Sequence, residues 1–269
     1  MERRYNGSAW HDRFLPRLTS AEVQALPKEE ALVVLPIGAV EQHGSHLPVY
    51  TDTLLAESVL DEACKYVPER YAVWLLAPMP YGISSEHSGR AGTISLSIPT
   101  LQGVLMDIAQ GVRESGFRRL LLFNGHGGNS ALLNLMAREV RLKTGLMVFC
   151  LNVGGLTIEE GLITEKERLL GIHGGDYETS LIMASYPEWV REERLGAEYP
   201  RLEEHSRYLR FQNAGFAWTI DDVSESGILG DARTASADKG KLLYDRQGRQ
   251  VADILMELTS FEIGKLKQQ

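Results

Sequence analysis

Short, mainly apolar runs recur along the chain and predict the strands of a sheet. Residues 31–37 (ALVVLPI) include three β-branched side chains, which is typical of a strand that is covered on both faces. Comparable apolar runs at 72–79, 119–125 and 145–153 predict three further strands. Each of these runs ends in a loop that carries polar side chains.

Longer stretches between these runs have apolar residues three or four positions apart. This spacing places the apolar side chains on one face of a helix, where they pack against a sheet. A T-x-x-E capping box at Thr19 predicts an additional short helix before the first strand. The expected longer helices cover residues 53–66, 101–112, 132–140 and 236–262.

The alternation of strands and helices predicts an α/β fold with three layers, α/β/α, around a central, mainly parallel sheet. Strands that alternate with helices in this way form a parallel sheet covered on both faces. In open sheets of this kind, ligands bind beyond the carboxyl ends of the strands. We therefore expect the functional site in the loops that follow the predicted strands.

The second half of the chain is less regular. Residues 156–172 are charged and predict a surface helix or lid. In the stretch that follows, Asp176 is expected to be a helix N-cap, with Glu178 in the first turn. Residues 188–212 are polar and uninformative, and 216–222 (FAWTIDD) predict a late strand.

Composition narrows the class of protein. The chain has 269 residues, of which 43% are hydrophobic and 24% charged, as in a globular protein with one core. A formal net charge of −8, with no cluster of Lys and Arg on one predicted face, argues against a nucleic-acid partner. No apolar run approaches the roughly 20 residues that cross a bilayer, and the N-terminus has no signal-peptide pattern. Cys64 and Cys150 are expected to be reduced packing residues in a cytoplasmic protein.

The loop after the first predicted strand concentrates metal-ligand types. Glu41 and His43 are two positions apart, so in an extended segment their side chains leave on the same side. Asp52 follows at the start of the next predicted helix. Two carboxylates and an imidazole suit zinc, manganese or iron better than calcium. The alternatives are an ordinary surface loop for the Glu-x-His pair and a helix cap for Asp52.

Histidines gather in four glycine-rich loops, at positions 43, 46, 87, 126 and 173. These loops lie where a doubly wound fold assembles its site. Simpler explanations exist for single residues: His46 or His87 as a solvated side chain, NGHGGN as a tight turn that leads to a helix N-cap at Asn129, and Glu178 as a carboxylate favoured by the helix dipole.

Four motifs, in this order and at these separations, resemble the creatininase (creatinine amidohydrolase) family: GAVEQHGSHLPVYTD, YGISSEHSGRAGTISL, NGHGGN and HGGDYETS. The resemblance covers roughly residues 31–240. It implies a single creatininase-like domain over 1–269, a centre of two divalent metal ions (Zn²⁺ and/or Mn²⁺, or Fe²⁺), and a homohexamer built as a trimer of dimers.

The resemblance also implies roles for individual residues. Glu41 and His126 would hold one metal, His43 the other, and Asp52 would bridge them. Creatininase proper has a glutamate ligand where this chain has Gly128, so we expect Glu178 to supply the missing ligand, as in family members that share the NGHGGN form. The remaining roles are His173 as a catalytic proton shuttle and Ser85, Glu86, His87 and Asn129 as substrate contacts, Asn129 alternatively orienting His126.

The implied activity is that of a metal-dependent amidohydrolase, in which hydroxide activated by two metals cleaves a C–N bond of a cyclic amide. The segment before His173 has no tryptophan, whereas creatininase proper closes aromatic side chains over its substrate there. We therefore expect a small-molecule substrate other than creatinine. The alternatives are a diketo-inositol or formamide substrate, or a non-catalytic binding protein on the same scaffold.

Overall fold

A parallel sheet of four strands forms the centre of the computed structural model, which describes residues 7–211 and 215–267. In spatial order the strands are β2, β1, β3 and β4, and every neighbouring pair is parallel. Their bounds are Leu32–Ile37 for β1, Val73–Leu75 for β2, Arg119–Asn124 for β3 and Met147–Asn152 for β4. The two central strands, β1 and β3, are buried along their whole length, as their mainly apolar sequences predict.

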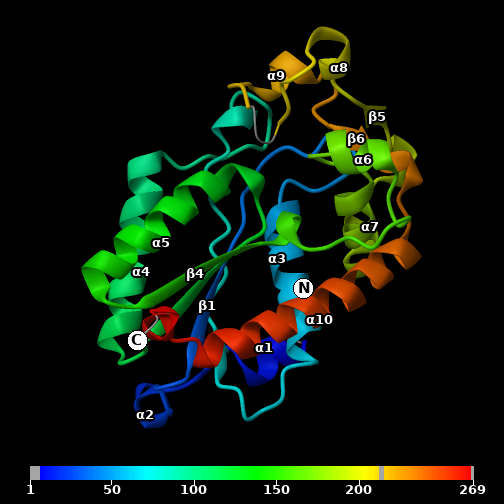
Figure 1. The fold of residues 1–269 in the computed structure, drawn as a ribbon. Helices are drawn as coiled ribbons and strands as arrows, with labels where there is room; N and C mark the ends of the chain where they lie inside the picture. The colour runs from blue at the N-terminus through cyan, green and yellow to red at the C-terminus, as the bar shows by residue number, and fades with distance from the viewer. Residues whose placement is uncertain (1–6, 212–214, 268–269) are drawn as a thin grey trace.

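Helices cover both faces of this sheet (Figure 1). Side chains alternate between the faces, so Val34 packs into one hydrophobic cluster and Val33 into the other. The first cluster is covered by α3 (Thr51–Cys64), α7 (Asp176–Ser185) and α10 (Ala237–Ser260), and the second by α4 (Ile98–Glu114) and α5 (Ser130–Thr144). The predicted three-layer α/β/α fold is confirmed.

The strand order places a switch point between β1 and β3. The chain leaves β1 through α3 to reach β2 on one side, and then crosses through α4 to β3 on the other side. The loops that follow β1 and β3 therefore diverge at their carboxyl ends, which leaves a crevice where ligands of open α/β sheets bind.

Smaller elements surround this frame. The predicted capping box is present at α2, where the side chains and backbone of Thr19 and Glu22 bond reciprocally. Beyond the sheet, a two-stranded antiparallel ribbon pairs β5 with β6. The remaining helices and strands are α1 (Ser8–Asp12), α2 (Ser20–Ala25), α6 (Glu165–Leu170), β5 (Ala197–Glu198), α8 (Leu202–His205), α9 (Ile220–Val223) and β6 (Gly230–Asp231).

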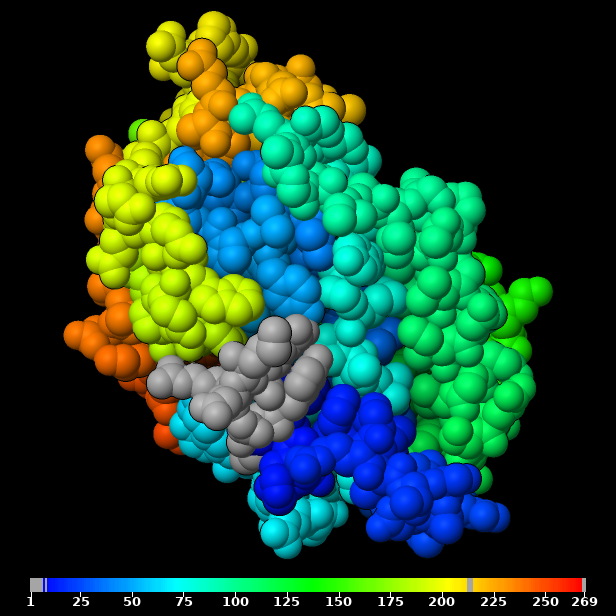
Figure 2. Space-filling view, turned by 180° about the vertical axis from the view of Figure 1, so that it is seen from behind, coloured from blue at the N-terminus to red at the C-terminus, as the bar shows by residue number. Residues whose placement is uncertain are grey.

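Segment 186–205 packs beside the loop that follows β1. Figure 2 shows this segment in yellow next to the blue of residues near 45–50. A hydrogen bond from the backbone N–H of Arg191 to the carbonyl oxygen of His46, at 2.9 Å, joins the two. The region that was uninformative in sequence thus borders the end of the sheet where the predicted site residues lie.

Several predicted elements need correction. The strand expected at 216–222 is wrong, because Thr219 and Asp222 form a capping box that starts helix α9 instead. The strand expected at 72–79 ends at Leu75, since Pro78 has no N–H to donate to a ladder. Within the charged segment 156–172, α6 buries Glu167 and Leu170, so this segment is more than a surface element.

Among the described residues, no helix is both long and apolar enough to cross a membrane.

Candidate metal centre

The loop after β1 carries Glu41 and His43 into the interior. Both side chains are fully buried. The loop stays close to α3 because Gly38 has no side chain; a Cβ there would lie 2.2 Å from Oγ1 of Thr53. Helix α3 begins at Thr51, so Asp52 lies in its first turn and faces the same space. The nominal N-cap is Tyr50, so Asp52 does not serve as the helix cap.

The loop after β3 brings His126 to the same point. Asn124, the last residue of β3, fixes this loop: its side-chain oxygen accepts the backbone N–H of His126 at 3.2 Å, and its side-chain nitrogen donates to the His126 carbonyl at 2.6 Å. His126 is 4% exposed. The imidazole therefore enters the centre from the strand beside β1, as the strand order requires.

The third contribution comes from the loop before α7, which carries His173, and from α7 itself, which carries Glu178. The two are linked, because the backbone N–H of Gly174 donates to Oε2 of Glu178 at 2.6 Å. The expected N-cap role of Asp176 is wrong. It is the first helical residue, Gly175 occupies the cap position, and the Asp176 carboxylate instead bonds Lys239 at 2.5 Å and Ser180 at 3.0 Å.

The five predicted ligands converge in two groups that share Asp52. The ligand atoms within each group lie within 4.8 Å of one another. Oδ1 of Asp52 lies 3.4 Å from Nε2 of His43, and Oδ2 lies 3.4 Å from Nδ1 of His126. The first group consists of Glu41, Asp52 and His126, and the second of His43, Asp52 and Glu178.

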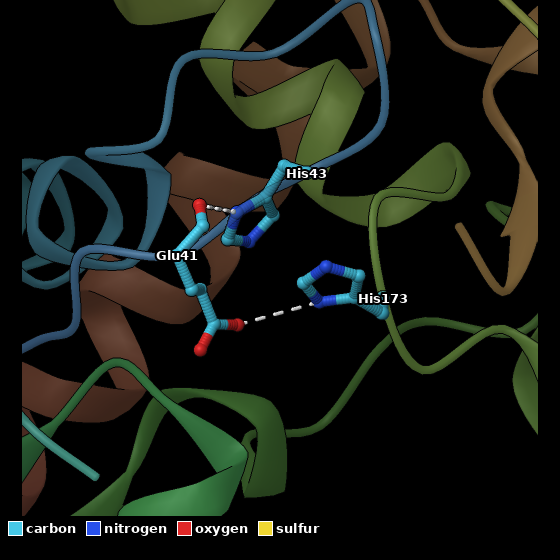
Figure 3. Close-up of side chains that lie close together, drawn as sticks. All are labelled: Glu41, His43 and His173. Carbon is cyan, nitrogen blue, oxygen red and sulfur yellow. Dashed lines mark hydrogen bonds and ion pairs between the residues drawn. The ribbon is translucent and has the colours of Figure 1, made fainter. Parts of the chain in front are cut away.

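Hydrogen bonds leave one nitrogen of each histidine free to face these carboxylates. Nδ1 of His43 donates to the carbonyl oxygen of Glu41 at 3.1 Å, so Nε2 is the nitrogen that remains for a metal ion (Figure 3). Nε2 of His126 donates to the carbonyl oxygen of Ile83 at 2.8 Å, which leaves Nδ1 for a metal ion. Backbone carbonyls of this kind commonly fix the tautomer of a metal-binding imidazole.

The site is electrostatically strained without a cation. Burial raises the pKa of Glu41 to about 8, and the nearby Asp52 carboxylate adds to the shift. Burial and the Asp52 carboxylate likewise raise the pKa of Glu178, against the opposing charge of His43. For carboxylates crowded in this way, a bound cation replaces the lost solvation.

The pKa values of the two histidines shift upward. Burial lowers the pKa of His43, but the carboxylates of Asp52 and Glu178 outweigh it and raise the value to about 10. The pKa of His126 rises to about 10 for the same reason, with Glu41 and Asp52 outweighing burial. Without metal, these imidazoles therefore carry the positive charge that the carboxylates require.

The donor atoms fit a metal centre because several of them have no other partner. Four buried atoms of three of these residues lack a hydrogen-bond partner among the described residues: Oε1 and Oε2 of Glu41, Nε2 of His43 and Oδ2 of Asp52. Buried polar atoms in folded proteins are nearly always bonded. Oxygen and imidazole donors around a shared carboxylate suit zinc, manganese or iron.

The residues expected to contact substrate take different positions. In the turn Ser85–His87, Ser85 is exposed, Glu86 is partly buried and His87 is 2% exposed. Oε1 of Glu86 lies 3.5 Å from Nε2 of His126, and Nε2 of His87 lies 3.5 Å from Oε1 of Glu41. Glu86 and His87 thus border the first group of ligands.

Asn129 is fully buried and ties three loops together. Its side-chain oxygen accepts the Ile83 N–H at 2.9 Å, and its side-chain nitrogen donates to the carbonyl of Gly38 at 3.0 Å. It lies at the N-cap position of α5 but makes no side-chain cap bond there. These bonds favour an orienting role for Asn129 over direct contact with substrate.

His173 and His46 separate into different environments. Nδ1 of His173 lies 3.5 Å from Oε1 of Glu41, so this imidazole joins the centre (Figure 3). His46 is 1% exposed and bonds Oγ1 of Thr179 at 2.9 Å, away from the ligand groups. Burial lowers the pKa of both, to about 4 for His46 and well below the usual value for His173, with the charge of His43 adding to each shift.

Gln42 is a residue of the site that no sequence motif indicated. Its side chain contacts His87, His173 and Gly227. In an extended segment its side chain leaves on the side opposite to Glu41 and His43, so the alternation of side chains does not place it with the ligands. The sequence signal for Gln42 is its position between two predicted metal ligands, Glu41 and His43.

A family model and several known proteins are similar to this chain over most of its length. The family model described as "Creatininase: Creatinine amidohydrolase" matches residues 16–255. The chain is 31% identical to the creatinine amidohydrolase of Pseudomonas putida, covering 91% of this chain and 96% of that protein. It is 32% identical to the mycofactocin precursor peptide peptidase of Mycobacterium tuberculosis (88% and 90% covered) and 25% identical to the 3-dehydro-scyllo-inosose hydrolase of Thermotoga maritima (94% and 86% covered).

Solved structures give the same match. A manganese form of creatininase has a TM-score of 0.75 at 29% identity, covering 92% of this chain and 99% of that chain. A mutant creatininase described as the Zn-Zn type has a TM-score of 0.74 at 28% identity, covering 92% and 98%. These similar proteins carry zinc or manganese.

Proposed function

Because the chain belongs to the creatininase family of metal-dependent amidohydrolases, we propose that it hydrolyses a C–N bond in a small cyclic amide with the help of two divalent metal ions. The observation that carries this proposal is the set of buried atoms on Glu41, His43 and Asp52 that can bind a metal ion and have no hydrogen-bond partner among the described residues. Those atoms surround a point that also borders His173 and His87. A cation pair would satisfy them, and an amide bound there would meet both ligands and titratable groups.

Two sites share one carboxylate in this proposal. Glu41, His126 and Oδ2 of Asp52 would hold one ion, and His43, Glu178 and Oδ1 of Asp52 the other. The 3.4 Å distances from the two oxygens of Asp52 to the two histidines support this division. Glu178 supplies the second carboxylate that Gly128 cannot provide.

When bound, such ions would polarise a substrate carbonyl and make a water molecule easier to deprotonate. His173 then moves the proton. Its buried imidazole is neutral, because burial lowers its pKa, so Nδ1 can take a proton from that water. The oxygen of the water bonds to the carbonyl carbon, the electrons of the C–N bond pass to nitrogen, and the nitrogen takes the proton from His173.

Glu86 and His87 are placed to contact the substrate. Both border the ligand group that contains Glu41, and Glu86 is the more accessible of the two. Burial opposes ionisation of Glu86, but the neighbouring His126 outweighs it and lowers its pKa, so the side chain is a carboxylate. A carboxylate beside the reacting group selects substrates with an N–H or a cationic nitrogen. Ser85, at the exposed start of the turn, would contact the outer part of the substrate.

Zinc or manganese is the expected metal, and iron(II) is also compatible with these donors. The test is turnover of a panel of creatinine, hydantoins, small lactams and formamides by protein loaded with zinc or manganese. We expect hydrolysis of a cyclic amide that stops when a chelator removes the metal and returns with zinc or manganese but not with calcium. Full activity in protein shown by elemental analysis to be free of metal would contradict the proposal.

A diketo-inositol is the alternative substrate class. The similarity to the 3-dehydro-scyllo-inosose hydrolase supports it, since opening such a ring needs the same activated water. Adding a diketo-inositol and an N-formyl compound to the panel separates these options from a cyclic amide.

The assembly is inferred from the resemblance, and the location from the two cysteines, which are expected to be reduced. We infer a homohexamer built as a trimer of dimers, a single domain over residues 1–269 and a cytoplasmic protein. Light scattering on the purified, metal-loaded protein measures the first of these directly, and a mass of one or two chains would exclude the hexamer.

A further inference from the structure

Gln42 forms a polar junction immediately behind the metal centre. It is 6% exposed, and its side-chain nitrogen lies 2.7 Å from the carbonyl oxygen of Gly227, 2.9 Å from Nδ1 of His87 and 3.1 Å from Nε2 of His173. Its side-chain oxygen accepts the backbone N–H of Gly44 at 3.0 Å. These contacts determine which ring nitrogen of His87 and of His173 carries the proton.

Backbone groups fix the orientation of the Gln42 amide. The carbonyl of Gly227 accepts only, so it requires the NH₂ end, and the N–H of Gly44 donates only, so it requires the oxygen end. A flipped amide would oppose two acceptors at 2.7 Å and two donors at 3.0 Å. The NH₂ group therefore faces His87.

His173 has its proton on Nε2. This nitrogen lies 2.7 Å from the backbone carbonyl oxygen of Gln42, which can only accept. The 3.1 Å approach of the Gln42 side-chain nitrogen to the same atom is consequently a contact between two donors, not a bond. The bare nitrogen of His173 is Nδ1, which faces Oε1 of Glu41 at 3.5 Å.

His87 turns its protonated ring nitrogen toward the centre, whereas His173 turns its unprotonated nitrogen there. One hydrogen of the Gln42 NH₂ goes to Gly227, and the second reaches Nδ1 of His87, which must accept. The proton of neutral His87 is therefore on Nε2, 3.5 Å from Oε1 of Glu41. The rings of His87 and His173 stack with centroids 4.2 Å apart, so a donor and an acceptor lie side by side.

We propose that Gln42 is a positioning residue that fixes His87 as a hydrogen-bond donor, through Nε2–H, and His173 as a proton acceptor, through Nδ1, at the reacting atoms. His87 then donates to the substrate oxygen, and His173 handles the proton of the attacking water. This assignment rests on the proposed hydrolytic function for its use, but the tautomers follow from hydrogen bonds alone.

Gly227 makes room for this junction. Its φ is +86°, and a Cβ there would lie 2.2 Å from Oε1 of Gln42. The loop that carries Gly227 also pairs with the loop of His173, through the backbone hydrogen bonds between His173 and Leu229. Gln42 thus joins the three loops that carry Glu41, His87 and His173.

The test is nitrogen NMR of the zinc-loaded protein with ¹⁵N-labelled histidine, because protonated and bare ring nitrogens resonate far apart and zinc is diamagnetic. The variants His87→Gln and His173→Asn assign the signals. We expect a proton on Nε2 and a bare Nδ1 in both residues. A proton on Nδ1 of His87, or on Nδ1 of neutral His173, would overturn the proposal whether or not the enzyme turns over an amide.

The Gln42→Glu variant tests the causal step. A carboxylate accepts only, so His87 must then place its proton on Nδ1 and lose the inward donor. Acetohydroxamate, a probe that presents an anionic oxygen to paired metals, should bind this variant roughly tenfold to a hundredfold more weakly, as expected for a lost hydrogen bond to a charged group. The matched control, Gln250→Glu on α10, lies outside the site and should bind as tightly as the unaltered protein.

An unchanged His87 tautomer in Gln42→Glu would contradict the proposal. If this variant does not fold, the spectrum of the unaltered protein still decides the tautomers. Failure of the proposed function would look different: no amide in the panel is hydrolysed, while the predicted tautomers are present.

Discussion

Oδ1 of Asp52 lies 3.4 Å from Nε2 of His43, and Oδ2 of the same carboxylate lies 3.4 Å from Nδ1 of His126. Both distances exceed a hydrogen bond of normal length. A single side chain in the first turn of α3 therefore connects His43, in the loop after β1, with His126, in the loop after β3. This relationship makes the residue the common element of the proposed centre.

The first prediction concerns this bridge. Replacing Asp52 by asparagine removes the charge shared by two cations, so elemental analysis should find fewer than two zinc ions per chain. The hydrolysis rate should fall roughly a thousandfold, since metal catalysis supplies several kcal/mol of transition-state stabilisation. Asp107→Asn, on the exposed side of α4, is the matched control and should retain both the metal and the rate. Retention of two ions in the Asp52 variant would refute the bridging role.

The second prediction separates the two half-sites. Glu178→Gln should lose the ion next to His43 and keep the other, whereas Glu41→Gln should lose the ion next to His126. Each variant is expected to bind about one zinc ion per chain, because one carboxylate ligand of each half-site has lost its charge. Anomalous diffraction at the zinc edge identifies which ion remains. Glu188→Gln, in the exposed turn after α7, controls for loss of a glutamate near that helix. Loss of the same ion in both variants would be the contrary result.

The third prediction is a pH dependence of the metal-free protein. The pKa values of His43 and His126 are raised to about 10, and that of Glu41 to about 8. The folded protein thus binds extra protons, and the stability contributed by these histidines is complete below about pH 6.5 and is lost as the pH rises through about 10. The deprotonating Glu41 acts in the same direction.

Urea denaturation measures this effect. The midpoint of metal-free protein should be lower at about pH 9.5 than at about pH 6, and zinc should reduce the difference because it replaces the protons. His11→Gln, at an exposed histidine, should behave like the unaltered protein. A midpoint that rises with pH in the absence of metal would show that the carboxylates do not depend on protonated histidines.

The fourth prediction concerns Gly128, which packs against the centre. A Cβ there would lie 2.2 Å from Oε1 of Glu86, 2.5 Å from Nε2 of His126 and 2.8 Å from the Ile83 carbonyl oxygen. Gly128→Ala should therefore cost about 1–3 kcal/mol in the free energy of unfolding and weaken zinc binding at the His126 half-site. Gly127→Ala is an adjacent control, since a Cβ at Gly127 meets no atom within 4 Å in the described structure. Equal stability of both variants would show that the loop adjusts freely.

Much of the fold follows from the sequence because the strands of the central sheet are mainly apolar. Side chains such as Val33 and Val34 are buried on opposite faces of β1, so the run needs no polar alternation and is distinct from the helices around it. The strand prediction for residues 216–222 is wrong because their aromatic and β-branched side chains suit a strand, whereas the capping box of Thr219 and Asp222 starts a helix there.

The metal ligands could be predicted because their spacing reflects backbone geometry. The residues that hold the ligand loops in place could not be predicted in this way. Glu41 and His43 share a side of an extended segment, and Glu178 lies one helical turn from the loop that carries His173. Gln42 acts through partners 45 and 131 positions away in the chain, and no local pattern encodes such contacts. The same holds for Glu167, whose buried carboxylate accepts the backbone N–H of Asp176 and of Asp231.

The central claim is that five side chains hold two cations around Asp52. A crystal structure of the zinc-loaded protein, with anomalous difference maps recorded on both sides of the zinc edge, measures this directly. We expect two peaks, one among Glu41, Asp52 and His126 and the other among His43, Asp52 and Glu178. A single peak that does not contact Asp52, or no peak in protein supplied with zinc, would contradict the account.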